Sequence, residues 1–282
     1  MKIIITLLLL IFTNLIALDI TLVPYTEQTN YKNSVKKSST INGFYTKFKE
    51  PTYYIELDYE TMNLDNNETV TTIKQTDYTL AYSYYLKQNY QFKTAYHKMS
   101  NNNKIASSGN TYLFGIKYFK KNKFDLGLDI SYSNYDKTAL TQDIYQLKPY
   151  FEITFGDYKS TMGKYILKID SNVFYPKATD TNSTNIKNCS SYGISIQQIK
   201  GDFINKFSAY KGKEIFAVKN NGFSINNQNE LYTSGYTLFT RYSVSENLGV
   251  SFSYKRENFT EIDSNIKSNL QRYLLLLDYT IK

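Results

Sequence analysis

Residues 124–133 read FDLGLDISYS, and this stretch decides the fold class. Its apolar side chains stand at every second position from Phe124 to Tyr132, and aspartate, glycine and serine fill the positions between them. Successive side chains of a β-strand point to opposite faces, so a period of two residues is the pattern of a strand. The stretch therefore predicts a strand with one apolar face and one polar face.

The same alternation returns along the chain. It is clear in residues 53–59 (YYIELDY), 78–86 (YTLAYSYYL) and 248–254 (LGVSFSY), and no segment after residue 17 has a sustained helical period. The alternating segments extend over about 9 to 14 residues, whereas soluble strands average roughly 5 to 6 and a tilted membrane-spanning strand needs about 9 to 11. The pattern predicts strands that cross a membrane.

Aromatic residues stand at the ends of these apolar sets, where they would form the two interfacial girdles of a barrel. The polar face carries charges such as Glu56, Asp58, Lys168 and Asp170. The dry interior of a soluble β-sandwich would not tolerate them, so we favour a barrel with a wet lumen. The ring pairs are Tyr53 and Tyr59, Tyr112 and Tyr118, Phe124 and Tyr132, and Tyr273 and Tyr279.

The links between the expected strands alternate in length. Short periplasmic turns and longer outer loops are typical of outer-membrane barrels. About 13 strands run from residues 40–48 to 270–281, and one more within 19–31 gives about 14, an even number. Pro24 interrupts that first segment, and 12 strands is the alternative. The short links are 49–51, 87–89, 120–123, 156–160, 200–202 and 244–247, and the long ones are 62–70, 99–109, 134–141, 176–187, 212–229 and 258–267.

In the alternation of apolar and polar side chains, the aromatic residues at strand ends and the alternation of short and long links, nearly all of residues 18–282 resemble the Gram-negative outer-membrane β-barrel class. Within that class they resemble the porin-like single-chain barrels. The resemblance implies an all-β fold: a single antiparallel up-and-down transmembrane β-barrel of about 14 strands in the outer membrane. It also implies outer-membrane lipid and lipopolysaccharide, the barrel-assembly machinery and small solutes as partners. Such barrels usually end in an aromatic residue that the assembly machinery reads, whereas this chain ends in Ile281 and Lys282.

Residues 1–17 have the layout of a secretory signal peptide. Met1 and Lys2 precede an apolar run over residues 3–12, and the small residue Ala17 follows. We expect cleavage after Ala17, which leaves residues 18–282 as one barrel domain. An uncleaved single membrane anchor is the alternative, although the apolar run is short for a span.

Composition excludes several classes. The chain has 29 tyrosines, 17 phenylalanines and no tryptophan, yet its mean hydropathy is −0.46. It lacks the apolar runs of roughly 18 residues that a polytopic helical membrane protein needs, and its aromatic content argues against disorder. A single cysteine, Cys189, excludes a disulfide scaffold. The net charge of +8 is scattered along the chain, so we expect no nucleic-acid partner.

Strand parity assigns sixteen charged side chains to the lumen. Rings of charge in a narrow pore select ions and small solutes, and an even balance of signs predicts weak ion selectivity. The alternative is a solvated or ion-paired wall without a selective role. The acids are Glu56, Asp58, Glu60, Asp125, Asp129, Glu152, Asp170 and Asp278, and the bases are Lys93, Lys117, Lys148, Lys168, Lys206, Arg241, Lys255 and Arg272.

The long link 212–229 is more apolar than the other long links. We predict that it folds into the lumen as a constriction, with Lys213 and Lys219 facing the path and Phe216 and Phe223 packing on the wall. Alternatively, the two flanking strands simply extend above the membrane.

The sequence offers little for catalysis. His97 is the only histidine, so a multi-histidine metal site is excluded, and no glycine-rich phosphate loop is present. We expect no enzymatic activity, no metal and no cofactor. The predicted function is a porin-like channel for passive diffusion of small hydrophilic solutes. The alternative is a non-conducting barrel with a structural role or an adhesive role for its outer loops.

Overall fold

The computed structural model describes residues 18–67, 72–87, 89–102, 108–135, 142–178, 188–226, 230–262 and 264–282. The expected signal peptide, residues 1–17, lies outside this part of the chain. The elements are β1 (Asp19–Lys32), β2 (Lys36–Lys49), β3 (Tyr53–Asn66), β4 (Ile73–Leu86), β5 (Tyr90–Asn101), β6 (Gly109–Lys120), β7 (Phe124–Tyr135), β8 (Gln142–Gly156), β9 (Lys164–Ala178), β10 (Cys189–Lys200), β11 (Phe203–Glu214), β12 (Val218–Lys219), η1 (Asn220–Gly222), β13 (Ser224–Ile225), β14 (Glu230–Ser243), β15 (Leu248–Glu261) and β16 (Lys267–Ile281).

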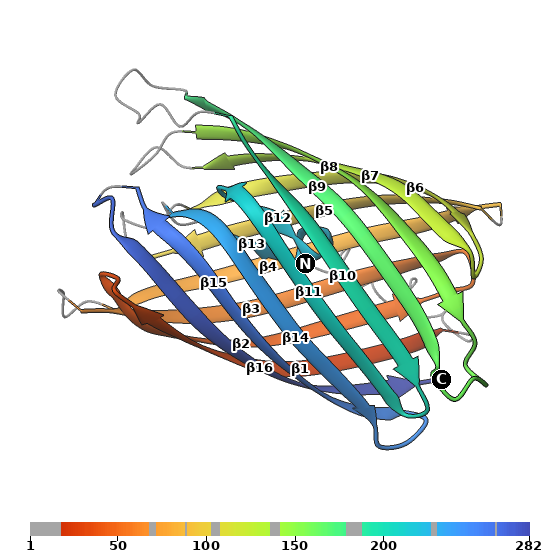
Figure 1. Cartoon of the computed structure of the whole chain (residues 1–282). Coiled ribbons are helices and arrows are strands. Elements are labelled where there is room, and N and C mark those ends of the chain that lie inside the picture. The colour runs from red at the N-terminus through yellow and green to blue at the C-terminus, as the bar shows by residue number, and fades with distance from the viewer. Residues whose placement is uncertain are drawn as a thin grey trace, which may run out of the picture.

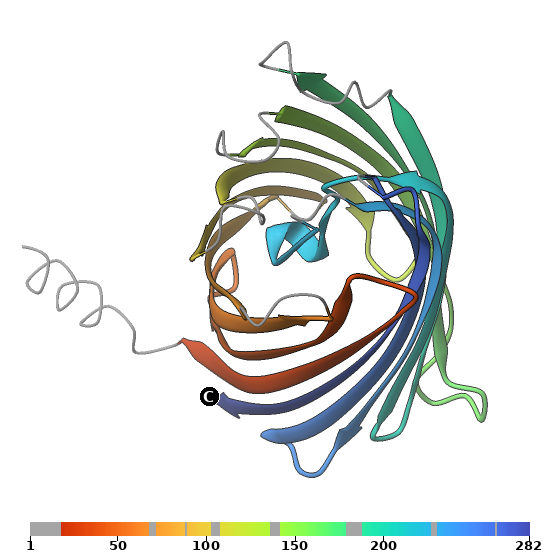
Figure 2. The ribbon, with the colours of Figure 1, turned by 90° about the vertical axis from the view of Figure 1, so that its left-hand side faces the viewer.

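The long strands form a single closed antiparallel β-barrel of 14 strands. Each strand pairs with its neighbours along the chain, β11 pairs directly with β14, and β1 closes the barrel against β16 (Figures 1 and 2). The prediction of an all-β up-and-down barrel with 14 strands is confirmed, and the alternative of 12 is wrong. Within the described part of the chain, no helix is long and apolar enough to cross a membrane.

Pro24 lies inside β1 without breaking it. On one side it pairs with Phe44 of β2. On the other side the register passes from Leu22 opposite Tyr279 to Tyr25 opposite Leu276, so Pro24 has no partner on β16. Proline has no N–H to donate to a neighbouring strand, and the gap in pairing at Pro24 falls on the β16 side only.

The connections differ between the two ends of the barrel. The short-link end holds the links 87–89, 121–123 and 201–202, the start of β1 and the end of β16. At the long-link end β9 and β11 end and β10 and β14 begin. Two links depart from the predicted sorting: 33–35 is short at the long-link end, and 157–163 is longer at the short-link end.

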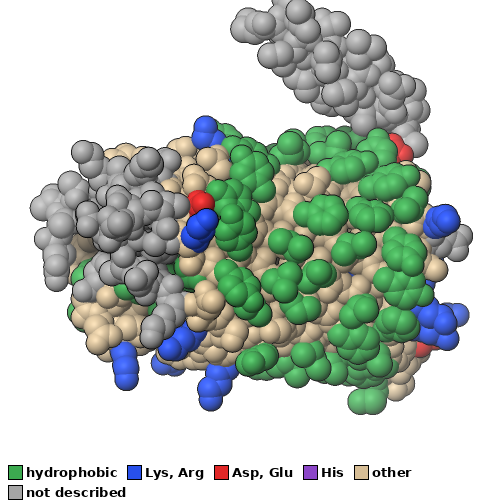
Figure 3. Space-filling model, turned by 90° about the horizontal axis from the view of Figure 1, so that it is seen from above, with side chains coloured by type: hydrophobic (Ala, Val, Ile, Leu, Met, Phe, Trp, Pro, Cys, Tyr) green, Lys and Arg blue, Asp and Glu red, His purple; other side chains and the backbone are tan. Residues whose placement is uncertain are grey.

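Two belts of aromatic rings encircle the outer surface. The belt nearer the long-link end contains the ring pairs Tyr59–Tyr78, Tyr96–Tyr112 and Tyr132–Tyr145, with centroids 5.2, 5.3 and 5.1 Å apart. The belt nearer the short-link end contains Tyr90–Tyr118, Phe155–Tyr165 and Phe203–Tyr242, at 5.3, 5.4 and 4.9 Å. Between them lies a band of exposed apolar side chains, and lysines and arginines lie mostly beyond it (Figure 3).

The polarity of the wall reverses beyond the belt at the long-link end. On β3, Met62 and Leu64 point inward and are buried, whereas Asn63 and Asp65 between them are exposed. Ile73 on β4 and Leu270 on β16 are buried in the same way. Side chains of a strand alternate between faces, so beyond the belt the interior becomes apolar and the exterior polar. This part of the barrel has a packed core rather than a wet lumen.

Candidate functional site

A short stretch of the chain lies inside the barrel. After β11 ends at Glu214, residues 215–226 turn inward through β12, η1 and β13, and Figure 2 shows them within the ring of strands. We call residues 215–226 the inner segment. Phe216, Asn220 and Asn221 have φ values of 48°, 49° and 60°, and Gly222 has 95°. Asparagine and glycine tolerate this left-handed region better than other residues, which permits the tight turn at η1.

Polar contacts tie the inner segment to the wall. The Val218 N–H donates to Gln146 Oε1 at 2.8 Å, and Gln146 Nε2 donates to the Val218 carbonyl at 3.1 Å. Lys93 Nζ donates to Asn221 Oδ1 at 2.7 Å. Because β8 and β5 each supply an anchor, the inner segment is attached to the wall at separate places around the barrel.

An apolar cluster holds the start of the inner segment. Ile215, Phe216 and Ala217 are fully buried, and the Phe216 ring packs on Tyr135 at 4.6 Å between centroids. Burying a phenylalanine side chain stabilises a fold by roughly 1.5–3 kcal/mol. The partners of these three residues in the cluster are Met99, Tyr135, Ile144 and Phe174.

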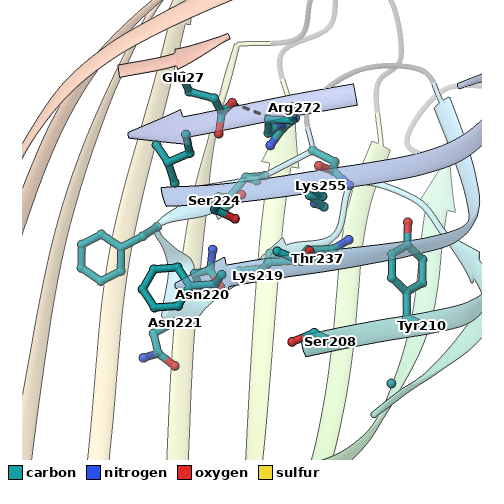
Figure 4. A pocket seen from close by; sticks show the side chains of 18 of the residues that line it. Glu27, Ser208, Tyr210, Lys219, Asn220, Asn221, Ser224, Thr237, Lys255 and Arg272 are labelled. Carbon is teal, nitrogen blue, oxygen red and sulfur yellow. Dashed lines mark ion pairs between the residues drawn. The ribbon is translucent and has the colours of Figure 1, made fainter. Parts of the chain in front are cut away.

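Lys219 forms the charged anchor of the inner segment. Its Nζ lies 2.6 Å from Glu214 and 3.3 Å from Glu257, and both carboxylates are buried. Burial lowers the pKa of Lys219, but the two carboxylates outweigh this effect and raise it to about 12. Lys255 also pairs with Glu257, at 2.8 Å. Figure 4 shows Lys219 and Lys255 in one pocket with the pair of Glu27 and Arg272, whose atoms are 3.2 Å apart.

The lumen contains a cavity of about 970 Å³ beside the inner segment. Most of the charged residues predicted for the lumen line it. They are Glu56, Asp58, Glu60, Asp129, Lys148, Lys168, Asp170, Lys206, Lys255, Arg272 and Asp278.

The other predicted lumen charges pair with lumen residues of opposite sign. Lys93 lies 3.0 Å from Asp129, and Lys117 lies 3.1 Å from Asp125. The pairs Lys168–Glu152 and Arg241–Asp278 are 2.9 and 2.6 Å apart. Much of the lumen charge is therefore neutralised within the wall.

Sequence reasoning missed several charges around the cavity. Glu27 and Asp77 line it from β1 and β4, and Glu214 lines it at the end of β11, in addition to the predicted Lys219. Glu27 has the same strand parity as Tyr25, but the alternation of β1 is weak in sequence. With these residues the lining has more carboxylates than basic groups, whereas the count from sequence was even.

The four residues predicted for the constriction occupy different surroundings. Phe216 is fully buried in the apolar cluster. Lys219 and Phe223 line the cavity, and the Phe223 ring lies 5.6 Å from the Tyr45 ring. Lys213 is exposed and does not line the cavity. Of the two predicted lysines, only Lys219 faces the interior.

His97 is buried in the wall, where its Nδ1 lies 2.7 Å from Thr79 Oγ1. Its Nε2 is 4.0 Å from Asp77. In the described part of the chain, no group of three histidine, cysteine or acidic side chains could hold a metal ion.

No protein-family model and no curated protein matches the sequence. Several solved structures match the fold at 8% sequence identity. The CymD monoaromatic hydrocarbon channel has a TM-score of 0.59, covering 93% of this chain and 87% of that chain. A bacterial polysaccharide outer membrane secretin has a TM-score of 0.57, and the match covers 94% of this chain and 98% of that chain. A Pseudomonas aeruginosa FadL homologue has a TM-score of 0.53, and the match covers 93% of this chain and 90% of that chain. The chain therefore has the closed-barrel fold of these bacterial channel and secretin structures, the fold of the outer-membrane class that its sequence resembles.

Proposed function

We propose that the protein is a porin-like channel of the Gram-negative outer membrane, in which small hydrophilic solutes diffuse passively past the inner segment. The observation that carries this proposal is the contrast between the two faces of one wall. Apolar side chains and aromatic belts cover the outside, and charged side chains line a cavity of about 970 Å³ inside. A polar lumen inside an apolar barrel is the design of water-filled membrane channels.

The inner segment makes the proposed path narrow. Barrels of about 16 to 18 strands leave an open aqueous channel, whereas about 8 strands are filled by side chains, so 14 strands leave modest space. Residues 218–221 and 223–226 border the cavity and reduce that space further. Where the wall charges form ion pairs, such as Lys117–Asp125 and Lys168–Glu152, their fields largely cancel, and this supports weak selectivity between small inorganic ions along that part of the path.

Solute uptake into proteoliposomes tests the channel. Vesicles that contain the purified protein should swell in isotonic glycine or glycerol and should not swell in a large oligosaccharide. Vesicles without protein supply the control. No swelling with any small solute would contradict the proposed diffusion.

The packed end of the barrel favours a second candidate. Leu64, Ile73, Leu270 and Phe216 fill the interior at the long-link end with buried apolar side chains. A barrel closed there would not conduct and could serve a structural role or present its outer loops for adhesion. The swelling assay separates the two functions, because a closed barrel admits no solute.

We also propose that the outer surface binds the phosphate groups of lipopolysaccharide. Three tyrosines of the long-link belt lie directly across a strand pair from basic residues: Tyr78 from Lys98, Tyr192 from Lys211 and Tyr236 from Arg256. These three basic side chains are exposed. Belt tyrosines lie at headgroup level, where a neighbouring cation can meet a lipid phosphate.

Binding of lipid A to the purified protein tests this surface. The variant with Lys98→Gln, Lys211→Gln and Arg256→Gln should retain less lipid A than the native protein, and the difference should shrink at high salt. A matched control replaces Lys87, Lys121 and Lys159 of the short-link end by glutamine. Equal loss in both variants would contradict a specific surface. Insertion by the barrel-assembly machinery also belongs to this proposal, since a membrane-spanning barrel in the outer membrane needs such a route.

A further inference from the structure

Four carboxylates form a continuous stripe on one side of the lumen. Glu56, Asp58 and Glu60 occupy successive inward positions of β3, and Asp77 lies on β4 directly opposite Glu60. All four line the cavity. Like charges that face each other across a strand pair are destabilising, so this arrangement costs free energy unless a positive charge or a bound proton offsets it. We call these four residues the acidic stripe.

The protein places little positive charge beside the stripe. Lys47 of β2 lies directly opposite Glu56, but its Nζ stands over the Tyr54 ring, 4.0 Å from the ring centroid. Most of the other lumen carboxylates pair with lysine or arginine, for example Asp129 with Lys93 and Asp278 with Arg241, whereas Asp170 accepts a hydrogen bond from Asn172. Among the described residues, no lysine or arginine nitrogen lies within ion-pair distance of the acidic stripe, and His97 Nε2 is 4.0 Å from Asp77.

Neutral donors satisfy only part of the stripe. The Tyr25 hydroxyl lies 3.0 Å from Asp58 and 2.7 Å from Glu60, but it has one proton to donate. Tyr45 donates to Glu56 at 2.5 Å, and Gln75 donates to Asp77 at 2.7 Å.

Two carboxylate oxygens of the stripe are left without a donor. Glu56 and Asp77 are only 8% and 5% exposed, and the oxygens Glu56 Oε2 and Asp77 Oδ1 are buried without a hydrogen-bond partner. An unsatisfied buried acceptor costs about 1–3 kcal/mol, and more when it is charged. Both side chains line the cavity, so these two oxygens lie in its wall.

The spacing of the stripe indicates which kind of cation fits. Inward side chains at alternate positions of a strand are roughly 7 Å apart, so Glu56 at one end of the stripe is separated from the facing pair Glu60 and Asp77 at the other end. Consistent with this, the described residues contain no group of three that could hold a metal ion. An organic cation with several N–H donors can instead contact successive carboxylates. The rings of Tyr25 and Tyr45 line the same cavity and offer faces for cation–π contact.

We propose that the acidic stripe is a binding site for solutes that carry ammonium or guanidinium groups. The inference rests on the proposed channel function, and it gives the channel a substrate class. A cationic solute exchanges the charge repulsion of Glu60 and Asp77 for charge-assisted hydrogen bonds. Anionic solutes of similar size meet four carboxylates at the same place and are disfavoured.

Agmatine, which has a guanidinium and an ammonium group, is a suitable probe. Purified protein is examined by thermal unfolding and by conductance in planar bilayers, each with agmatine, glutamate or Mg²⁺. The test variant carries Glu56→Gln, Asp58→Asn, Glu60→Gln and Asp77→Asn, which retain acceptors for Tyr25 and Tyr45. The control variant carries Asp125→Asn and Glu152→Gln, two lumen carboxylates paired with lysines. Where the test variant fails to fold, the pair Glu60→Gln and Asp77→Asn replaces it.

Agmatine should raise the unfolding temperature and block the current of the native protein and of the control. Its apparent affinity should fall about tenfold or more in the test variant, which corresponds to about 1.4 kcal/mol. Equal effects of agmatine and glutamate, stronger binding of Mg²⁺ than of agmatine, or unchanged block in the test variant would each overturn the inference. A protein that binds agmatine but never conducts would keep the site and contradict the channel. A protein that conducts but does not bind agmatine would support the channel and contradict the binding site.

Discussion

Gln146 binds both backbone polar groups of Val218, accepting from its N–H at 2.8 Å and donating to its carbonyl at 3.1 Å. The side chain of a wall strand thus makes the two hydrogen bonds that a neighbouring strand would make. Both groups are buried, so each would cost free energy if left unpaired. This contact fixes the inner segment across the lumen, and the width of the proposed path depends on it.

Replacing Gln146 by alanine should loosen the inner segment. The buried Val218 N–H and carbonyl would lose their partners, at a cost of about 1–3 kcal/mol for each unsatisfied group. We expect larger or more variable single-channel currents from Gln146→Ala. Gln197→Ala is the control, since Gln197 lines the same cavity from β10. If the two variants gave the same currents as the native protein, Gln146 would not hold the path narrow.

Replacing Lys219 by methionine should destabilise the barrel. Glu214 would lose its only lysine partner among the described ion pairs, and Glu257 would keep only Lys255. Removing one partner of a buried ion pair typically costs about 3–5 kcal/mol. Urea unfolding in detergent micelles measures the loss. Lys213→Met, which changes an exposed lysine of the same connection, should leave the unfolding midpoint almost unchanged.

A glycine on β2 makes room for a lumen tyrosine. Tyr25 lies directly opposite Gly43, and a Cβ on Gly43 would come within 2.1 Å of the Tyr25 ring. Gly43→Ala should therefore displace the ring from Asp58 and Glu60 and cost about 1–3 kcal/mol, as overpacking does. In the Tyr25→Ala background the same change should cost little, so a double-mutant cycle measures the coupling. Equal costs in both backgrounds would show that the ring does not need this space.

Much of the fold can be predicted from sequence because each strand carries its own signal. The period of two in β3, β4, β7 and β15 reports which face meets apolar surroundings, and this face is the same all around a barrel. The strand β1 can be predicted although its own alternation is weak. An antiparallel barrel whose two chain ends lie at the same end needs an even number of strands, and the other segments supply only 13. The tolerance of Pro24 follows from the pairing gap on the β16 side, which becomes visible only once the register is known.

The site is less accessible to such reasoning because it depends on contacts between distant residues. The apolar character of residues 212–229 indicates that the link packs on something, but nothing in the sequence connects Val218 with Gln146. The pairing of Glu60 with Asp77 requires the register of β3 and β4, which parity alone does not supply. Leu64 falls in the predicted link 62–70, and the sequence does not indicate that it packs with Ile73 in a core inside the barrel.

Single-channel conductance of the native protein beside a variant lacking residues 215–226, joined by a short glycine–serine linker, tests the central claim most directly. Gel mobility with and without heating first establishes that both form barrels. We predict small steps from the native protein and clearly larger steps from the variant, because the inner segment narrows the path. A native protein without conductance, or steps of equal size in both proteins, would contradict a channel constricted by this segment.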